Sequence, residues 1–257
     1  MKTNNPFLLH NIDHLSASSI NLWVSDPCRW CLKYLMKIDG DFGASAQRGN
    51  IIEWALERLL SKGDYVTVDE LQNMFTKTLN DKNIDTEDKK SVEELKNLED
   101  YYQMTVNNCK YDNLLNYQEK IEVQYADLPI PIVGYIDFVF KDFILDLKTT
   151  GKMPSKCPES VKRQMAVYSM VYTQYDMVVD YVTPKKYQTF KLEELQLYRR
   201  QVYDICMGLM RFLSTSDNPL QLTQSFHPNF DHWAWDDTMK NEAKKYGDLY
   251  EKYWKKN

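Results

Sequence analysis

The chain has 257 residues, of which 43% are hydrophobic and 27% charged, a composition typical of a folded protein with a substantial core. No apolar run approaches the roughly 20 residues of a membrane span, and no apolar signal-peptide segment follows the N-terminal residues. The net charge of −5 is unfavourable for a protein that grips DNA over a wide surface, although it leaves a locally basic site open. Five cysteines, an odd and scattered set, argue against a disulfide scaffold and indicate a reducing, cytoplasmic location.

Helical periodicity dominates the first half of the chain. Residues 1–14 carry no periodic signal and are expected to form an extended arm. Apolar residues at helical spacing predict helices over about 15–24, 28–37, 47–60, from Val68 onward and over 91–115. The Ser91–Glu94 capping box is expected to open the last of these helices. The N-terminal portion, 15–117, is therefore expected to be mainly helical.

Strand periodicity begins at Gln118, where alternating polar and apolar residues predict a half-buried strand over 118–125. Further strands are predicted over 134–140, 143–150, 177–182 and 187–191. Further helices are predicted over 159–174 and 192–213, and a last, charged helix is predicted to end at Lys256. This order predicts one single domain, 1–257, with an α/β core over 118–191 and C-terminal helices over 192–257.

Two carboxylates and a lysine interrupt the apolar strands on either side of Lys141–Asp142. If these two residues form the turn, Asp137 lies directly opposite Asp146, and side-chain alternation places Lys148 on the same face as Asp146. Two facing carboxylates repel each other, and burying them without partners is costly. The pattern therefore indicates a bound cation, although an isolated D-x-K is more often a salt-bridged group within a sheet.

The ligand types favour a hard divalent cation. Asp137 and Asp146 supply carboxylate oxygens, and the main-chain carbonyl of Leu147 is a third candidate, a set that suits Mg²⁺ or, in its place, Mn²⁺. Lys148 could orient or deprotonate a water, or neutralise a phosphate oxygen. Such an arrangement suits hydrolysis of a phosphodiester.

Cys28 and Cys31 have the spacing of half a zinc or iron–sulfur site. No second cysteine pair and no Cys/His cluster in the sequence supplies the remaining ligands. Two buried thiols on a helix are therefore the favoured interpretation.

Three segments together resemble a known family. They are Gly134-Tyr135-Ile136-Asp137, Leu145-Asp146-Leu147-Lys148-Thr149-Thr150 and Gln164-Met165-Ala166-Val167-Tyr168. Their order resembles the pattern G-x-x-D, D-x-K-T and Q-x-x-x-Y of the RecB-like branch of the PD-(D/E)xK nucleases. Upstream, residues 15–20, 26–30 and Arg48-Gly49-x-x-x-Glu53 look like the opening helices and the G-x-x-x-(H/E) motif of that family. The resemblance spans about residues 15–240.

The resemblance implies a restriction-endonuclease-like α/β fold, in which helices flank a central mixed sheet. It implies that Asp137, Asp146 and Glu53 ligate the metal and that Lys148 is the catalytic lysine. Glu53 stands where many relatives carry His, which favours hard cations further.

Residues around this site are expected to contact the substrate. Gln164 and Tyr168 lie one helical turn apart, so they would share a face, border the site and contact the nucleic-acid backbone. Basic residues are further candidates for phosphate contacts: Arg48, Lys152, Lys162 and Arg163.

Several relatives carry a [4Fe–4S] cluster held by one N-terminal cysteine and a C-terminal trio after an F-x-P-N segment. Cys28 lies near the first position, and Phe226-His227-Pro228-Asn229 looks like that segment, but residues 233–237 contain no cysteine. No iron–sulfur cluster is therefore expected. Trp233 and Trp235 are expected to pack the C-terminal segment against the N-terminal helices instead.

The resemblance implies a Mg²⁺-dependent DNA exonuclease that acts in phage or mobile-element DNA recombination or degradation. Two alternatives stay open: a catalytically inactive nuclease-fold module that binds DNA or protein, and a structure-specific endonuclease of the same fold. A CRISPR-adaptation nuclease is disfavoured by the missing cysteines. The expected partner is DNA, with no membrane association. Ring-shaped relatives leave a homo-oligomer open, and a recombination partner protein is open as well.

Overall fold

The computed structural model describes residues 5–38, 40, 43–125, 127–230, 235 and 239–240. Within these residues, no helix is both long and apolar enough to cross a membrane. The chain divides into two compact units. Unit 1 comprises Met1–Asp41, Glu122–Gly134 and Gln196–Asn257, and unit 2 comprises Phe42–Ile121 and Tyr135–Leu195. Each unit is thus assembled from segments that are far apart in the sequence.

Unit 1 contains short, capped helices. Its elements are α1 (Pro6–Leu9), β1 (Leu15–Ser16), α2 (Ala17–Ser25), α3 (Pro27–Tyr34), α9 (Pro219–Thr223) and, from Gln196 onward, α8 (Leu195–Leu213). The Asn5 side chain accepts a hydrogen bond from Phe7 N, and Pro6 occupies the first turn, so α1 forms where the sequence pattern predicts an extended arm. One helical turn is too short to show a repeat, which explains the wrong prediction.

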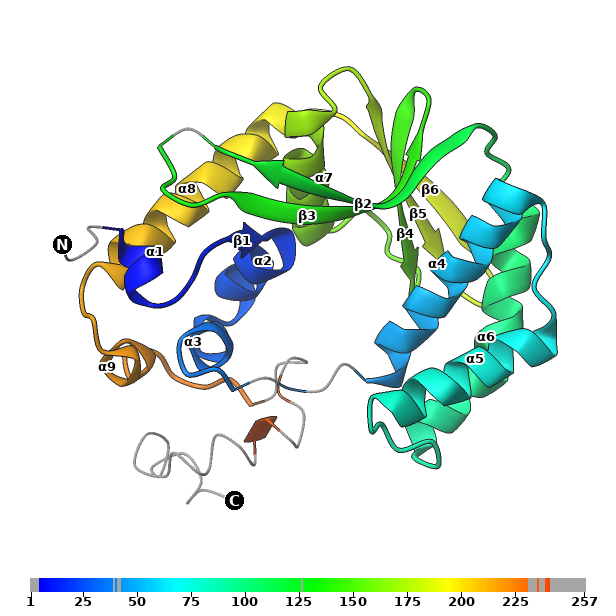
Figure 1. Ribbon diagram of the computed structural model, residues 1–257, viewed down its shortest axis with the longest axis horizontal. Helices are drawn as coiled ribbons and strands as arrows, with labels where there is room; N and C mark the ends of the chain where they lie inside the picture. Colours follow the sequence, from blue (N-terminus) through cyan, green and yellow to red (C-terminus); the bar gives the residue numbers. More distant parts are fainter. Residues whose placement is uncertain are drawn as a thin grey trace. The chain divides into compact units, whose positions relative to one another are not determined.

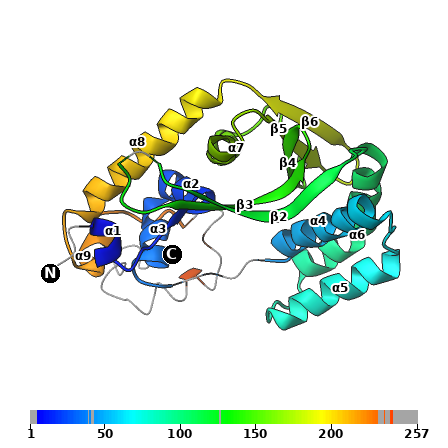
Figure 2. The same ribbon diagram turned by 45° about the horizontal axis from the view of Figure 1, so that its top comes forward.

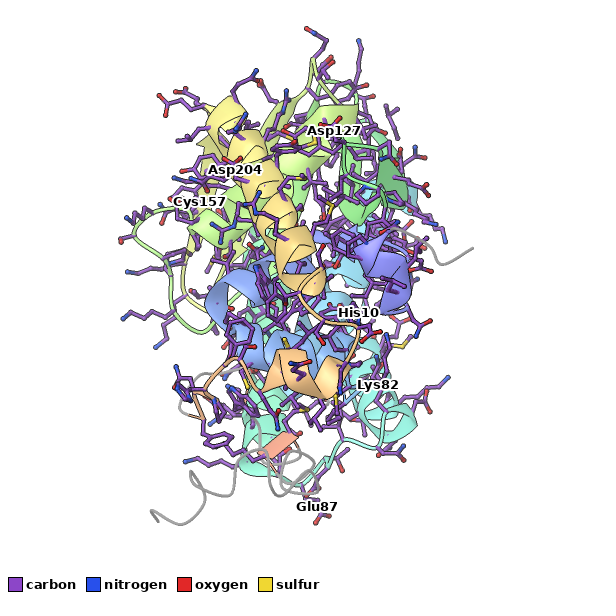
Figure 3. The ribbon with its side chains drawn as sticks, turned by 90° about the vertical axis from the view of Figure 1, so that its left-hand side faces the viewer. His10, Lys82, Glu87, Asp127, Cys157 and Asp204 are labelled. Atoms are coloured by element: carbon purple, nitrogen blue, oxygen red, sulfur yellow. The ribbon has the colours of Figure 1, made fainter. Side chains whose placement is uncertain are left out.

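His10 links the N-terminal and C-terminal segments of unit 1 (Figure 3). This buried side chain donates its Nε2 proton toward the carbonyl oxygens of Leu213 and Ser216, at 3.3 and 3.0 Å. The interaction joins residues that lie about 200 positions apart in the sequence.

A small core joins α3 to the C-terminal segment of unit 1. It contains Cys28, Leu32, Ile38, Trp235 and Met239. Trp235 Nε1 also donates to Asp26 Oδ2 at 2.5 Å. The predicted packing of Trp235 against the N-terminal helices is confirmed, whereas Trp233 and the predicted helix up to Lys256 lie outside the described residues.

Unit 2 contains longer helices, namely α4 (Ala44–Lys62), α5 (Val68–Asp81), α6 (Lys89–Asn108) and α7 (Glu159–Val171). The start of α6 corrects the prediction of a capping box at Ser91. Asp88 accepts hydrogen bonds from Lys90 N and Ser91 N, at 2.7 and 3.2 Å, so Asp88 is the N-cap. An aspartate cap satisfies two free N–H groups here and starts the helix earlier. The helix also ends at Asn108, short of the predicted end at 115.

In the part of the chain that the structure describes, the sheet has six strands, and its path is β1-β3-β4-β5-β6, with β2 paired to β3 (Figure 1). The further strands are β2 (Leu114–Val123), β3 (Ile132–Phe140), β4 (Phe143–Thr149), β5 (Asp176–Val182) and β6 (Tyr187–Leu192). The β3–β4 and β5–β6 pairs are antiparallel, whereas β1–β3 and β4–β5 are parallel. The mixed sheet flanked by helices confirms the predicted fold class.

Helices cover both faces of the sheet in unit 2. Residues of α4, α5 and α6 share one hydrophobic core with alternate strand residues that include Phe138, Leu145 and Leu147. The helix α7 lies on the other side of β4 and β5, as the two views together show (Figures 1 and 2). Because strand side chains alternate, the even-numbered residues of β4, Asp146 and Lys148, point to the face opposite that core.

Candidate active site

The β3–β4 hairpin brings two carboxylates together. Its turn is Lys141–Asp142, and its register pairs Phe138 with Leu145 and Val139 with Ile144. One step further along this register, Asp137 stands opposite Asp146, as predicted. Asp137 is 8% exposed and Asp146 is 0% exposed, so both acids are removed from bulk water.

Lys148 and Gln164 hold the Asp146 carboxylate from two elements. Lys148 Nζ donates to Asp146 Oδ1 at 2.9 Å and lies 2.8 Å from Oδ2. From α7, Gln164 Nε2 donates to Asp146 Oδ1 at 2.8 Å. The structure thus brings the predicted lysine and the predicted glutamine to the same acid.

Tyr168 completes a short hydrogen-bond chain. Gln164 Nε2 donates to the Tyr168 hydroxyl at 2.8 Å, and that hydroxyl donates to the Tyr135 carbonyl at 2.7 Å. The chain ties α7 to β3 two residues before Asp137. Gln164 and Tyr168 therefore fix the geometry of the acids as well as bordering them, as expected for side chains one helical turn apart.

Glu53 approaches the acids from α4. It is partly buried, and Gln118 Nε2 of β2 donates to its Oε2 at 3.1 Å. Burial, with the charges of Asp137 and Asp146, raises the pKa of Glu53 to about 9, while Lys148 acts to lower it. This mutual repulsion places Glu53 within the electrostatic field of the hairpin.

Burial and the neighbouring Asp146 raise the pKa of Asp137 to about 7, although the Leu147 N–H donates to Asp137 Oδ2 at 3.0 Å. Burial acts to lower the pKa of Lys148, but the carboxylates of Asp146 and Asp137 outweigh it and raise that pKa above its usual value. The lysine therefore keeps its positive charge at neutral pH.

The donor set of the site fits a hard cation. Asp146 Oδ2 is buried and accepts no hydrogen bond of good geometry, although Lys148 Nζ lies 2.8 Å from it. All the candidate ligands are oxygen atoms, and Asp146 acts to raise the pKa of both Asp137 and Glu53, as a nearby carboxylate does. In the described part of the chain, however, no three His, Cys, Asp or Glu side chains are already gathered as a metal site.

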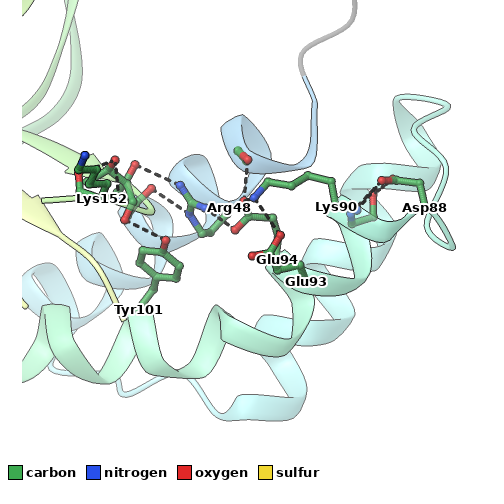
Figure 4. A network of polar contacts seen from close by, with 11 residues as sticks. Arg48, Asp88, Lys90, Glu93, Glu94, Tyr101 and Lys152 are labelled. Atoms are coloured by element: carbon green, nitrogen blue, oxygen red, sulfur yellow. Dashed lines mark hydrogen bonds and ion pairs between the residues drawn. The ribbon is translucent and has the colours of Figure 1, made fainter. Parts of the chain in front are cut away.

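Arg48 has a different environment from the one that a phosphate contact requires (Figure 4). Its buried guanidinium forms an ion pair with Glu94 of α6. Arg48 Nε donates to Thr149 Oγ1 at 3.2 Å, and Nη2 donates to Thr149 O at 3.1 Å. The guanidinium also lies over the Tyr101 ring. Glu94 and Thr149 therefore hold Arg48 within the protein, and its predicted contact with substrate stays a prediction.

The remaining basic candidates lie near the surface of unit 2. Lys152 is exposed, and Lys162 is partly buried with Nζ 3.4 Å from Glu159 Oε1. Arg163 is partly buried as well, on α7 directly before Gln164. The three remain predicted phosphate contacts.

The sequence assigns no role at the site to Tyr101, Glu94 or Gln118. The Tyr101 hydroxyl donates to the Thr150 carbonyl at 2.9 Å, so it holds the chain just after β4. No local sequence pattern marks the distant partner of any of these residues. The cysteines behave as expected for thiols in a core, since all five are buried and form no disulfide.

The family model described as the PD-(D/E)XK nuclease superfamily matches residues 14–224. No curated protein matches the chain at a significant level. A solved structure of a candidate exonuclease from Eubacterium rectale is similar with a TM-score of 0.59 and 12% identity, over 94% of this chain and 93% of that one. A structure named SSO0001 is similar with a TM-score of 0.31 and 11% identity, over 80% of this chain and 86% of that one, and supports no conclusion.

The likeness to the Eubacterium rectale structure concerns the fold, which is the restriction-endonuclease-like α/β fold that the sequence predicts. The family match covers both strands of the Asp137–Asp146 hairpin and the helix that carries Gln164. The chain belongs to the PD-(D/E)XK nuclease superfamily.

Proposed function

We propose that this protein is a metal-dependent DNA exonuclease that acts in DNA recombination or degradation. The observation that carries the proposal is the joining of Asp137, Asp146 and Lys148 on one hairpin, with Gln164 holding Asp146 from α7. Family membership supports a nuclease. The proposal also includes DNA as the substrate and cleavage from a DNA end. It extends to the identity of the metal, the oligomeric state and any partner protein.

Glu53, Asp137 and Asp146, with the main-chain carbonyl of Leu147, would hold a Mg²⁺ or Mn²⁺ ion. When bound, such an ion polarises a phosphate and makes a nearby water more acidic. The charged Lys148 would bind a phosphate oxygen and stabilise the negative charge that develops on it. Its raised pKa supports this electrostatic role over that of a general base.

Gln164 would keep Asp146 in one orientation throughout, because the same amide is fixed to Tyr168 and, through it, to the β3 backbone. Lys152, Lys162 and Arg163 would contact the phosphates of the DNA on either side of the bond to be cut. This local positive charge offsets the net charge of −5 of the whole chain.

The proposal is tested with end-labelled linear DNA and the same DNA as a covalently closed circle, each with Mg²⁺. We expect degradation of the linear DNA and no cutting of the circle, since an exonuclease needs an end. Cutting of the circle would instead indicate an endonuclease. Binding of linear DNA without any cleavage, at every Mg²⁺ and Mn²⁺ concentration, would identify an inactive binding module.

The variant Asp146→Asn is expected to lose cleavage by about 10³-fold or more, because it removes a carboxylate that stabilises the transition state through the metal. Single-turnover cleavage of labelled DNA measures the loss. The matched control is Asp142→Asn in the exposed turn of the same hairpin, which changes the same charge and should retain wild-type cleavage. Equal rates for the two variants would show that Asp146 has no catalytic role.

A further inference from the structure

Gln118 of β2 contacts the acids from a third element. Its Nε2 donates to Glu53 Oε2 at 3.1 Å, which links β2 to α4 across 65 positions of sequence. The residue is exposed, so no core packing explains its placement.

Gln118 and Asp137 lie on neighbouring strands, since β2 pairs with β3. The carboxylates of Asp137 and Asp146 act to raise the pKa of Glu53, so these acids lie close enough to repel one another. The Gln118 amide thus fixes one carboxylate of this repelling group, Glu53 of α4.

The backbone of Gln118 is strained. Its φ is +49°, in the left-handed region, although it lies within a strand. This backbone conformation costs free energy for every residue except glycine, and the cost is smaller for asparagine and aspartate than for other residues. A left-handed residue inside a strand is typical of a β-bulge, which re-aims a side chain, and such strain gathers at functional sites. We therefore attribute the strain at Gln118 to the need to direct its side chain toward Glu53.

We propose that Gln118 is a positioning residue that holds the Glu53 carboxylate in place beside the hairpin acids for binding of one divalent cation. The inference rests on the proposed function, since it assigns Gln118 a task within the same site. The competing explanation is an exposed hydrogen bond with no influence on the acids. The two explanations differ in what happens to cation affinity when the amide is removed.

The experiment measures Mn²⁺ binding to the DNA-free protein by calorimetry, and thermal unfolding in EDTA, for Gln118→Gly and Gln118→Leu. Loss of a group that orients metal ligands lowers metal affinity by about 10-fold to 100-fold, so we expect both variants to bind Mn²⁺ that much more weakly. Gln118→Gly should unfold at a higher temperature than wild type, because glycine adopts the left-handed backbone without strain. Gln118→Leu keeps the strain and should gain no stability.

Glu194→Gly is the matched control. Glu194 also has a left-handed backbone, with φ of +55°, and is exposed in the segment between β6 and α8. It should gain stability as Gln118→Gly does and bind Mn²⁺ as wild type does. Weaker Mn²⁺ binding by a more stable protein is a result that a purely structural role for Gln118 does not produce.

Wild-type Mn²⁺ affinity in both Gln118 variants would overturn the inference, and so would an equal loss of affinity in Glu194→Gly. The same protein samples are assayed for cleavage of linear DNA, which separates the inference from the proposed function. If the variants bind Mn²⁺ with unchanged affinity and the wild type cleaves DNA, the inference alone is wrong. If the variants bind Mn²⁺ more weakly and the wild type does not cleave DNA, the proposed function alone is wrong.

Discussion

The buried acids of unit 2 differ in how completely their oxygens are satisfied. Asp180 is fully buried on the sheet face opposite Asp146, next to Leu147 in the register, and is satisfied by three hydroxyls. These donors are Tyr111, Tyr187 and Thr189. Asp146 is buried to the same degree, but its Oδ2 accepts no well-formed hydrogen bond. A satisfied buried acid stabilises a fold, whereas an incompletely satisfied one indicates a place for a ligand.

The raised pKa values of Glu53 and Asp137 predict that the metal-free protein loses stability as pH rises. The folded acids keep their protons up to about pH 9 and about pH 7, whereas the unfolded acids lose them near 4.5 and 3.8. Between these limits the folded state binds more protons than the unfolded state, so the free energy of unfolding falls with increasing pH. Urea denaturation in EDTA across this pH range measures the effect.

Asp137→Asn and Glu53→Gln provide the comparison, because their amides do not titrate. The free energy of unfolding of each variant should depend less steeply on pH than that of the wild type. A divalent cation should weaken the dependence as well, because binding displaces the protons from the carboxylates. If both variants keep the wild-type slope, other groups cause the pH dependence and the two acids are not repelling each other.

The end of β4 is held by α4 and α6. Arg48 contacts both the hydroxyl and the carbonyl of Thr149, the residue that follows Lys148. Burial acts to raise the pKa of Glu94, but hydrogen bonds from Ser45, Lys90 and Arg48 lower it overall, so Glu94 stays charged beside Arg48. This pair sets the position of the strand that carries Lys148.

Arg48→Met is expected to destabilise the protein by about 3–5 kcal/mol, because it removes the buried cation that pairs with the buried Glu94. Adding Glu94→Met should recover part of this loss, since the buried charge that lost this partner is then gone as well. Urea denaturation of the two single variants and of the double variant measures the coupling between them. Additive losses in the double variant would show that the two side chains do not depend on each other.

Lys152→Met is the contrasting variant for Arg48→Met. Lys152 is exposed, so its loss should leave the free energy of unfolding within about 0.5 kcal/mol of wild type. It should instead weaken DNA binding and reduce the salt dependence of that binding. Arg48→Met, where the protein remains folded, should bind DNA as wild type does. The reverse pattern would restore the role that the sequence alone predicts for Arg48.

At the scale of the whole molecule, both units join segments from distant parts of the chain. In unit 1, Trp235 packs with Cys28 and Leu32 and donates to Asp26, which caps α3. One oxygen of the Asp26 carboxylate therefore accepts a hydrogen bond from the α3 backbone, and the other accepts one from Trp235. This small core connects the N-terminal helices to the C-terminal segment.

Trp235→Ala is expected to cost about 3–5 kcal/mol of stability, because it empties a large buried volume and removes the hydrogen bond from Trp235 Nε1 to Asp26 Oδ2. Cys28 and Cys31 lie in α3, and they should react faster with a thiol reagent once this core loosens. Mass spectrometry measures the labelling rates, and Cys109 in unit 2 is the reference thiol. Trp235→Phe should show a smaller effect. An equal increase at Cys109 would contradict a local role for Trp235.

Short-range features of this protein follow from the sequence because their causes lie within a few residues. The two-residue turn at Lys141–Asp142 determines the hairpin register and hence the pairing of Asp137 with Asp146. Helical spacing similarly predicts the helix that brings Gln164 and Tyr168 to one face. Most strands and helices were predictable for the same reason. The errors include β1, which lies within the helix predicted over 15–24, and the start of α6, where Asp88 rather than Ser91 forms the cap.

Tertiary structure alone decided which polar residues meet. Arg48 has the local pattern of a substrate contact, yet Glu94 and Thr149 bind its guanidinium, and they lie 46 and 101 positions away in the sequence. Gln118 looks like any residue that begins an alternating strand, but its backbone is left-handed and its amide donates to Glu53 of α4. Periodicity reports which face a side chain takes, whereas its partner depends on how distant elements pack, and that information is absent from any short stretch of sequence.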